Sequence, residues 1–159
     1  IRISRSRLVK GEEYRGKIAS KRRFFFGFRV QLVTTRDKQP VQFFILPGSY
    51  VDVTALQMMH LNLPTGSEVY GDAGYTDYEQ EDFYADCEEI SLKIQRKRNS
   101  QRPDRAWEAA YKKSLRQRIE QAFSQITMRF PKKIHAVTEA GFLIKIVLFL
   151  LAYALETNL

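Results

Sequence analysis

The sequence has few of the residues that build cysteine and histidine sites. It contains one cysteine, Cys87, and two histidines, His60 and His135, among 159 residues. A single cysteine excludes an intramolecular disulfide and a cysteine-based zinc site. Two histidines are too few for a three-histidine zinc site, and neither has a serine or cysteine partner at a spacing typical of hydrolase triads. We expect His60 to lie on a helix and His135 in a loop.

Long apolar segments are also scarce. The longest, residues 140–155, contains Lys145 and is shorter than the roughly 20 residues that a membrane-spanning helix needs. The basic start, residues 1–7, is not followed by the apolar segment of a signal peptide, and no glycine-rich phosphate-binding loop occurs. We therefore predict a core helix over 140–155 rather than a membrane anchor, no contact with a membrane, and a cytoplasmic protein.

Positive charge is abundant and is arranged in blocks. The formal net charge is +8, and residues 1–36 hold 11 Lys and Arg against two acids. Residues 68–89 hold nine acids and no Lys or Arg, whereas residues 93–118 hold ten Lys and Arg against two acids. The basic blocks predict contact with a polyanion, most often nucleic acid, although solvated surface explains any single basic residue. The acidic block would repel DNA unless cations lie nearby.

Residue patterns predict a hairpin followed by alternating helices and strands. Residues 24–35 and 41–46 are the expected hairpin strands, and 51–63 shows helical spacing, with Ser49 or Asp52 as its cap. The remaining expected elements are strand 68–71, helix 77–88, strand 90–95, a basic loop over 96–104, and helices 107–130 and 138–155, the last capped by Thr138. This order is typical of an α/β sheet flanked by helices. We expect one domain over residues 1–159.

Asp72 stands at the end of the strand expected at 68–71 and is followed by Ala73 and Gly74. Small neighbours leave a carboxylate accessible and let a bulky polyanion approach closely. Carboxylates at strand ends are typical of ligand sites in α/β sheets. An Asx turn or a helix cap explains the same residue equally well, so spacing alone leaves both interpretations open.

Glu120 lies on the helix expected at 107–130, with Arg116 four residues earlier on the same face. An exposed ion pair, worth about 0.2–0.5 kcal/mol, is the interpretation that composition favours. A second ambiguous group is the cluster of aromatics among arginines. Base stacking and a buried strand face both explain it, and we favour the core for its members Phe24, Phe25, Phe26 and Phe28.

Several stretches, in chain order, resemble the C-terminal part of the DDE transposases of bacterial insertion sequences. They span nearly the whole chain: SRSRLVKGEEYRGKIASKRRFFFGFRVQLV, FFILPGSYVDVTAL, VYGDAGYTDYEQED, KIQRKRNSQRP, RQRIEQAFSQI and KKIHAVTEAGFLIKIVLFLLAYAL. The resemblance implies a ribonuclease H-like mixed α/β sheet flanked by helices. It also implies magnesium- or manganese-dependent cleavage and transfer of double-stranded DNA at transposon ends and targets.

The resemblance assigns roles to particular residues. Asp72, in YGDAGY, matches the second metal-binding carboxylate of the family, and Glu120, in RQRIEQAF, matches the third. Arg116 matches the arginine of the related Y-R-E-K signature. Lys113 and Thr127 stand where its tyrosine and lysine would be, so those two roles do not carry over. We expect Asp72 and Glu120 to lie close together as catalytic, metal-binding residues. The residues expected to contact DNA are Arg116, Lys97, Arg98, Arg22 and Arg23.

The family's first carboxylate has no counterpart in this sequence. In the family it closes the first strand, at the centre of the sheet, whereas this chain starts after that point. Asp37 is expected in a hairpin turn and Asp52 at a helix start, so neither replaces it. We therefore expect a catalytic domain truncated at its N-terminus and inactive by itself. The alternative is a non-catalytic basic nucleic-acid-binding protein derived from a transposase. The sequence leaves open whether the chain forms a homodimer.

Overall fold

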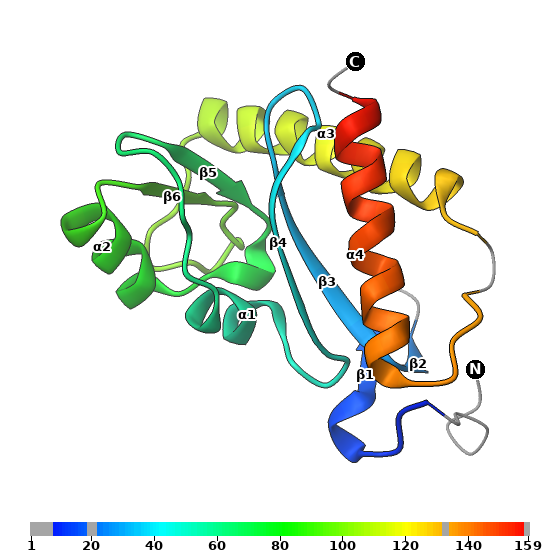
Figure 1. The fold of residues 1–159 in the computed structure, drawn as a ribbon. Coiled ribbons are helices and arrows are strands. Elements are labelled where there is room, and N and C mark those ends of the chain that lie inside the picture. The colour runs from blue at the N-terminus through cyan, green and yellow to red at the C-terminus, as the bar shows by residue number, and fades with distance from the viewer. Residues whose placement is uncertain (1–7, 19–21, 132–133, 158–159) are drawn as a thin grey trace. The chain divides into compact units, whose positions relative to one another are not determined.

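The computed structural model describes residues 8–18, 22–131 and 134–157. Within it the chain forms two compact units, which are treated separately below (Figure 1). One unit contains residues 1–50 and 121–159, and the other contains residues 51–120. The prediction of a single domain stays a prediction, because compact units of one chain need not fold independently.

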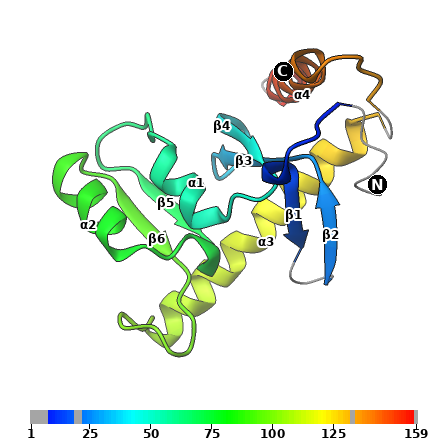
Figure 2. The same cartoon turned by 90° about the horizontal axis from the view of Figure 1, so that it is seen from below.

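The first unit begins with two antiparallel strand pairs. A 3-10 turn, η2 (Glu12–Tyr14), leads into β1 (Arg15–Ile18), which pairs with β2 (Arg23–Phe26) (Figure 2). The second pair, β3 (Phe28–Thr34) and β4 (Pro40–Pro47), is the hairpin that the sequence predicts. The single strand expected over 24–35 is divided at Gly27, whose φ of +149° is unfavourable for any residue with a side chain.

The core of the first unit lies between the β3–β4 hairpin and two helices. These are the end of α3 (Ala106–Arg129) and all of α4 (Glu139–Glu156), which runs along the hairpin in Figure 1. The Thr138 hydroxyl accepts a hydrogen bond from Gly141 N–H at 3.1 Å, so the predicted cap of α4 is confirmed. The buried cluster consists of Ile126, Ile146, Leu150 and Tyr153, and Val30, Leu32, Phe43 and Ile45 pack against it.

The second unit joins a parallel strand pair to short helices. Its elements are α1 (Asp52–Met58), β5 (Glu68–Gly71), the 3-10 turn η4 (Ala73–Tyr75), α2 (Tyr78–Cys87), β6 (Ser91–Ile94) and the first part of α3. Strand β5 pairs with β6 in parallel, with Glu68 opposite Ser91 and Gly71 opposite Ile94. The strands 68–71 and 90–95 and the helix 77–88 are therefore confirmed within one or two residues.

Helix α1 ends earlier than the helical spacing of residues 51–63 predicts. Leu61 is buried beyond the helix end, and its N–H donates to the Tyr84 hydroxyl at 3.2 Å. The same hydroxyl donates to the Met59 carbonyl at 2.9 Å. These tertiary hydrogen bonds compete with continuation of the helix. The predicted caps Ser49 and Asp52 are also wrong, because the N-cap is Val51, which forms no side-chain cap bond.

The α/β class predicted from the sequence is confirmed, with a difference in how the strands are grouped. The strands of the described residues form three two-stranded sheets rather than one continuous sheet. Across residues 8–18, 22–131 and 134–157, no helix combines the length and apolar character that crossing a membrane requires. Helix α4 instead buries one side and exposes Ile144, Leu148, Leu151 and Leu155.

Candidate functional site

Strand β5 places Asp72 directly beyond its last residue, Gly71. The Asp72 side chain is half-buried, and its Oδ1 accepts a hydrogen bond from Gly74 N–H at 2.7 Å. Asp72 is thereby the N-cap of η4. The turn cap that the sequence allowed is therefore present, and it uses one of the two carboxylate oxygens of Asp72, Oδ1, as its acceptor.

A second carboxylate, that of Asp52, lies beside Asp72. A Cβ atom added to Gly74 would stand 2.8 Å from Asp52 Oδ2 and 2.9 Å from Asp72 Oδ1. The two oxygens are therefore no farther apart than the sum of these distances, and the glycine leaves the space between them clear. The sequence placed Asp52 at a helix start and gave no sign of this neighbour, since the approach depends on how α1 packs against η4.

Glu120 lies on the exposed side of α3. Its Oε1 accepts a hydrogen bond from Arg116 Nε at 3.0 Å, and the two side chains are 62% and 51% exposed. The exposed i,i+4 ion pair that composition favoured is therefore present, and it contributes little to stability. Among the residues whose placement is described, no three His, Cys, Asp or Glu side chains form a group able to hold a metal ion. The predicted proximity of Asp72 and Glu120 stays a prediction.

Arg22 directly precedes β2 and Arg23 is its first residue, and both are exposed. Arg22 has a φ of +48°, a turn conformation that precedes the strand. Phe24, which follows Arg23 in β2, is 57% exposed, and the cationic groups of Arg15 and Lys17 lie 4.9 and 6.0 Å from its ring centroid. The expectation that Phe24 belongs to the core is therefore wrong, because β1, which the sequence did not predict, brings cations over its ring.

Lys97 and Arg98 lie in the segment between β6 and α3, hereafter the 96–105 loop. Both side chains are exposed, and within the described part of the chain neither forms a hydrogen bond or an ion pair. Their charge is therefore available to an external partner. This agrees with the loop expected from the sequence over residues 96–104.

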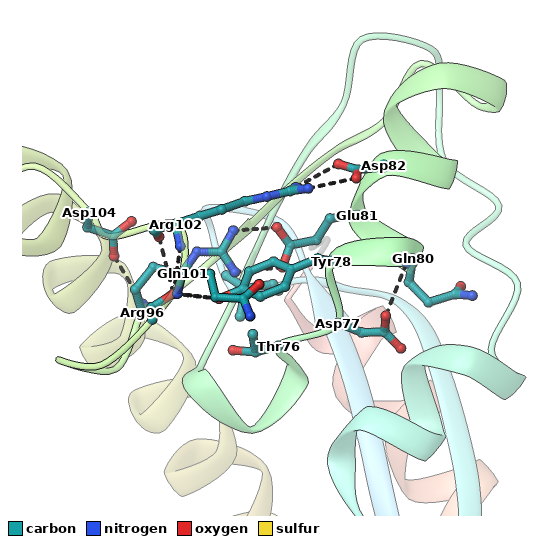
Figure 3. A network of polar contacts seen from close by, with 12 residues as sticks. Thr76, Asp77, Tyr78, Gln80, Glu81, Asp82, Arg96, Gln101, Arg102 and Asp104 are labelled. Carbon is teal, nitrogen blue, oxygen red and sulfur yellow. Dashed lines mark hydrogen bonds and ion pairs between the residues drawn. The ribbon is translucent and has the colours of Figure 1, made fainter.

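Other arginines of the 96–105 loop pair with the acidic helix α2 (Figure 3). Arg96 donates to both carboxylate oxygens of Glu81, one at 2.6 Å, and the two side chains are 10% and 7% exposed. Arg102 donates to both oxygens of Asp82 at 2.6 and 2.7 Å. Bidentate pairs of this kind fix orientation as well as charge.

These contacts change the electrostatics of the acidic block. The hydrogen bonds that Arg102 donates lower the pKa of the Asp82 carboxyl, and those that Arg96 donates to Glu81 raise the pKa of Arg96. Two carboxylates of the block are thus compensated by arginines of the following basic block. The sequence predicted only that the acidic block would repel DNA unless cations lie nearby, and partners 15 and 20 positions apart leave no periodic signal that identifies them.

The two ends of the 96–105 loop are fixed to each other. Asp104 Oδ2 accepts from Arg96 N–H at 3.0 Å, and Asp104 Oδ1 accepts from Lys112 Nζ at 2.5 Å. Lys112 also donates to the Ile94 carbonyl at 2.9 Å, and the side chains of Lys112 and Asp104 are largely buried. The loop is therefore closed at its base by a buried ion pair between Asp104 and Lys112 of α3.

Comparison with known proteins identifies one family. A family model described as "Transposase DDE domain" matches residues 2–155. No curated protein and no solved structure matches the chain. Because the match covers nearly every residue, including Asp72, Glu120 and both basic blocks, the chain belongs to the transposase DDE domain family.

Proposed function

We propose that this chain takes part in cutting and joining DNA strands as a DDE transposase. In this reaction water attacks a phosphodiester to release an element end, and the freed 3′-hydroxyl then attacks target DNA. The family match carries the proposal. The accessible carboxylate beyond β5, with a second carboxylate beside it, supports it.

The proposed metal-binding residues are Asp72 and Glu120, with Asp52 as a neighbour of Asp72. Mg²⁺ is held by one or two carboxylates together with substrate phosphates and water, so a carboxylate pair such as Asp52 and Asp72 suits its chemistry. A bound Mg²⁺ or Mn²⁺ supplies charge stabilisation to phosphate oxygens during in-line displacement. We expect cleavage only where a third carboxylate completes the group.

The chain's own cations would hold the DNA. Lys97 and Arg98 project from the 96–105 loop, and Arg22 and Arg23 from the β1–β2 pair. Contacts of these side chains with phosphate position a duplex without reading its sequence. Arg116 would give up part of its contact with Glu120 as the carboxylate engages a metal ion, and it would then face the DNA backbone.

Metal binding tests this proposal without relying on cleavage. The chain should broaden the electron paramagnetic resonance signal of Mn²⁺, and Asp72→Asn should abolish the effect, with Glu120→Gln weakening it. Asp37→Asn, which makes the same change in an exposed hairpin turn, is the matched control. Equal Mn²⁺ binding by the Asp72→Asn variant would refute the site.

A second candidate function is nucleic-acid binding without strand cleavage. One observation favours it: Asp72 and Glu120 each have a local structural role, as a turn cap and as an i,i+4 ion pair. On this alternative, Asp72→Asn and Glu120→Gln leave DNA affinity unchanged, and Mn²⁺ does not bind. Mn²⁺-dependent nicking of supercoiled plasmid by the protein, lost in Asp72→Asn, would exclude it.

A further inference from the structure

We propose that the 96–105 loop is a preformed phosphate-binding element, held in shape by side chains that do not themselves contact DNA. The contacting groups are Lys97 and Arg98. The positioning residues are Tyr78, Glu81, Asp82 and Asp104. The inference rests on the proposed function in assuming a DNA partner, and it adds the residues that make the loop competent to bind.

The base of the loop is fixed by buried polar contacts. Asp104 joins Arg96 N–H to the Lys112 ammonium group, and the Arg96 guanidinium is held by Glu81. These groups are about nine-tenths buried, so water competes weakly for them. The loop backbone is therefore held in place at Arg96, before Lys97 and Arg98, and at Asp104, after them.

The middle of the loop is fixed by Tyr78 of α2. Two guanidinium groups lie over its ring, that of Arg96 at 5.2 Å and that of Arg102 at 4.9 Å from the ring centroid (Figure 3). Its hydroxyl is 2.6 Å from Ser100 Oγ and accepts from Gln101 N–H at 3.2 Å. These hydrogen bonds lower the pKa of the Tyr78 hydroxyl. One side chain thus contacts Arg96 and the three consecutive residues 100–102 of the loop.

The basic residues of the loop therefore fall into two groups. Arg96 and Arg102 form ion pairs with Glu81 and Asp82, whereas the side chains of Lys97 and Arg98 are exposed. A loop that is ordered before binding loses less conformational entropy when phosphate arrives. We therefore attribute part of the DNA affinity to residues of the acidic helix, which by charge alone would oppose it.

The main test is Tyr78→Phe, because it removes a hydroxyl and leaves the net charge unchanged. Binding of a blunt duplex should weaken by about threefold to tenfold, as expected for loss of one or two hydrogen bonds that hold the loop. In a Lys97→Ala/Arg98→Ala background the same substitution should change affinity little, because the cations it positions are gone. Equal losses in both backgrounds would overturn the proposal.

Tyr84→Phe is the matched control. It removes another tyrosine hydroxyl of α2, one with two hydrogen bonds to Met59 and Leu61 and none to the loop. Tyr84→Phe should lower the melting temperature without a matching loss of DNA affinity. If Tyr84→Phe weakens binding as much as Tyr78→Phe does, general destabilisation explains both results and the proposal fails.

Asp82→Asn provides a test in which a charge effect and a positioning effect predict opposite changes in affinity for duplex DNA. Removing an acid and releasing Arg102 adds positive charge, so a purely electrostatic surface would bind duplex DNA more tightly. If Asp82 positions the loop, affinity falls instead, and tighter binding would overturn the proposal.

Failure of the unmodified chain to bind duplex DNA would overturn the proposed function as well, whereas normal binding by Tyr78→Phe would overturn this inference alone.

Discussion

At the scale of single residues, the dominant feature of the second unit is the buried contact between Glu81 and Arg96. Both charges are removed from water, and each compensates the other through two hydrogen bonds. A buried pair of this kind adds little net stability compared with apolar residues, yet breaking it leaves one charge without compensation. Loss of either member alone therefore costs more stability than the intact pair contributes.

Glu81→Gln should destabilise the chain strongly, because it leaves the Arg96 guanidinium buried without its counter-charge. We expect a loss of about 3–5 kcal/mol in the free energy of unfolding, measured by urea denaturation. The double variant Glu81→Met/Arg96→Met should recover much of that loss, because neither charge remains. A Glu81→Gln variant as stable as the unmodified chain would show that the pair is solvated in solution.

Asp82 should make stability depend on acid pH through Arg102. The Arg102 hydrogen bonds lower the folded-state pKa of Asp82 below its ordinary value of 3.8. The contact therefore stabilises the fold fully above that value, and the stabilisation is lost as pH falls through the lower, folded-state pKa. Carboxyl carbon NMR should show the Asp82 pKa rising in Arg102→Ala. An unchanged Asp82 titration in that variant would contradict the assignment.

The sequence predicted the exposure of single side chains better than it predicted contacts between pairs of side chains. Lys97 and Arg98 could be predicted as exposed cations because they stand in a polar, basic segment. Asp52 beside Asp72, and Glu81 beside Arg96, could not, since each pair is brought together by packing of separate elements. The sequence predicts Phe24 to lie in the core because the residue is apolar, and it gives no sign that β1, with its cations, pairs with the strand that contains Phe24.

At the scale of elements, hydrophobic periodicity predicted the long helices and the β3–β4 hairpin closely. It failed where tertiary contacts decide the local structure. Strand β1 has the sequence RGKI, with a glycine and two cations, so little in it favours a strand. The early end of α1 likewise depends on the Tyr84 hydroxyl, which lies more than twenty positions away.

The two sides of α4 provide a test within a single helix. Leu150 is 3% exposed in the core cluster, whereas Leu148 is 56% exposed. Leu150→Ala should cost about 2–5 kcal/mol of unfolding free energy because it leaves a cavity, and Leu148→Ala should stay within about 0.5 kcal/mol. Urea denaturation of both variants measures the difference. Equal effects would mean that the exposed side of α4 is covered in solution.

At the scale of the whole molecule, the net charge of +8 conceals an internal pairing of the acidic and basic blocks. Glu81 and Asp82 are compensated inside the second unit, so the remaining cations act outward with less opposition than composition suggests. This arrangement is consistent with the proposed binding to the DNA backbone, which would act through charge rather than through base recognition.

Duplex binding should therefore be strong at low salt and nearly independent of sequence. Reversal of charge in Lys97→Glu/Arg98→Glu should weaken binding to all duplexes alike and reduce the slope of log affinity against log salt by roughly two or more. Fluorescence anisotropy with duplexes of unrelated sequence measures both quantities. A loss confined to particular sequences would instead indicate base readout by these two residues.

Because the ribosome makes α4 after every other element of the first unit, the core of that unit is completed only when α4 has been made. The apolar residues of β3 and β4 pack against α4, which follows them by roughly a hundred positions. At a synthesis rate of about 5–20 residues per second, the hairpin waits roughly 5–20 s for its covering helix. During that interval Val30, Leu32, Phe43 and Ile45 lack their partners on α4, so the nascent hairpin exposes apolar side chains to which a chaperone can bind.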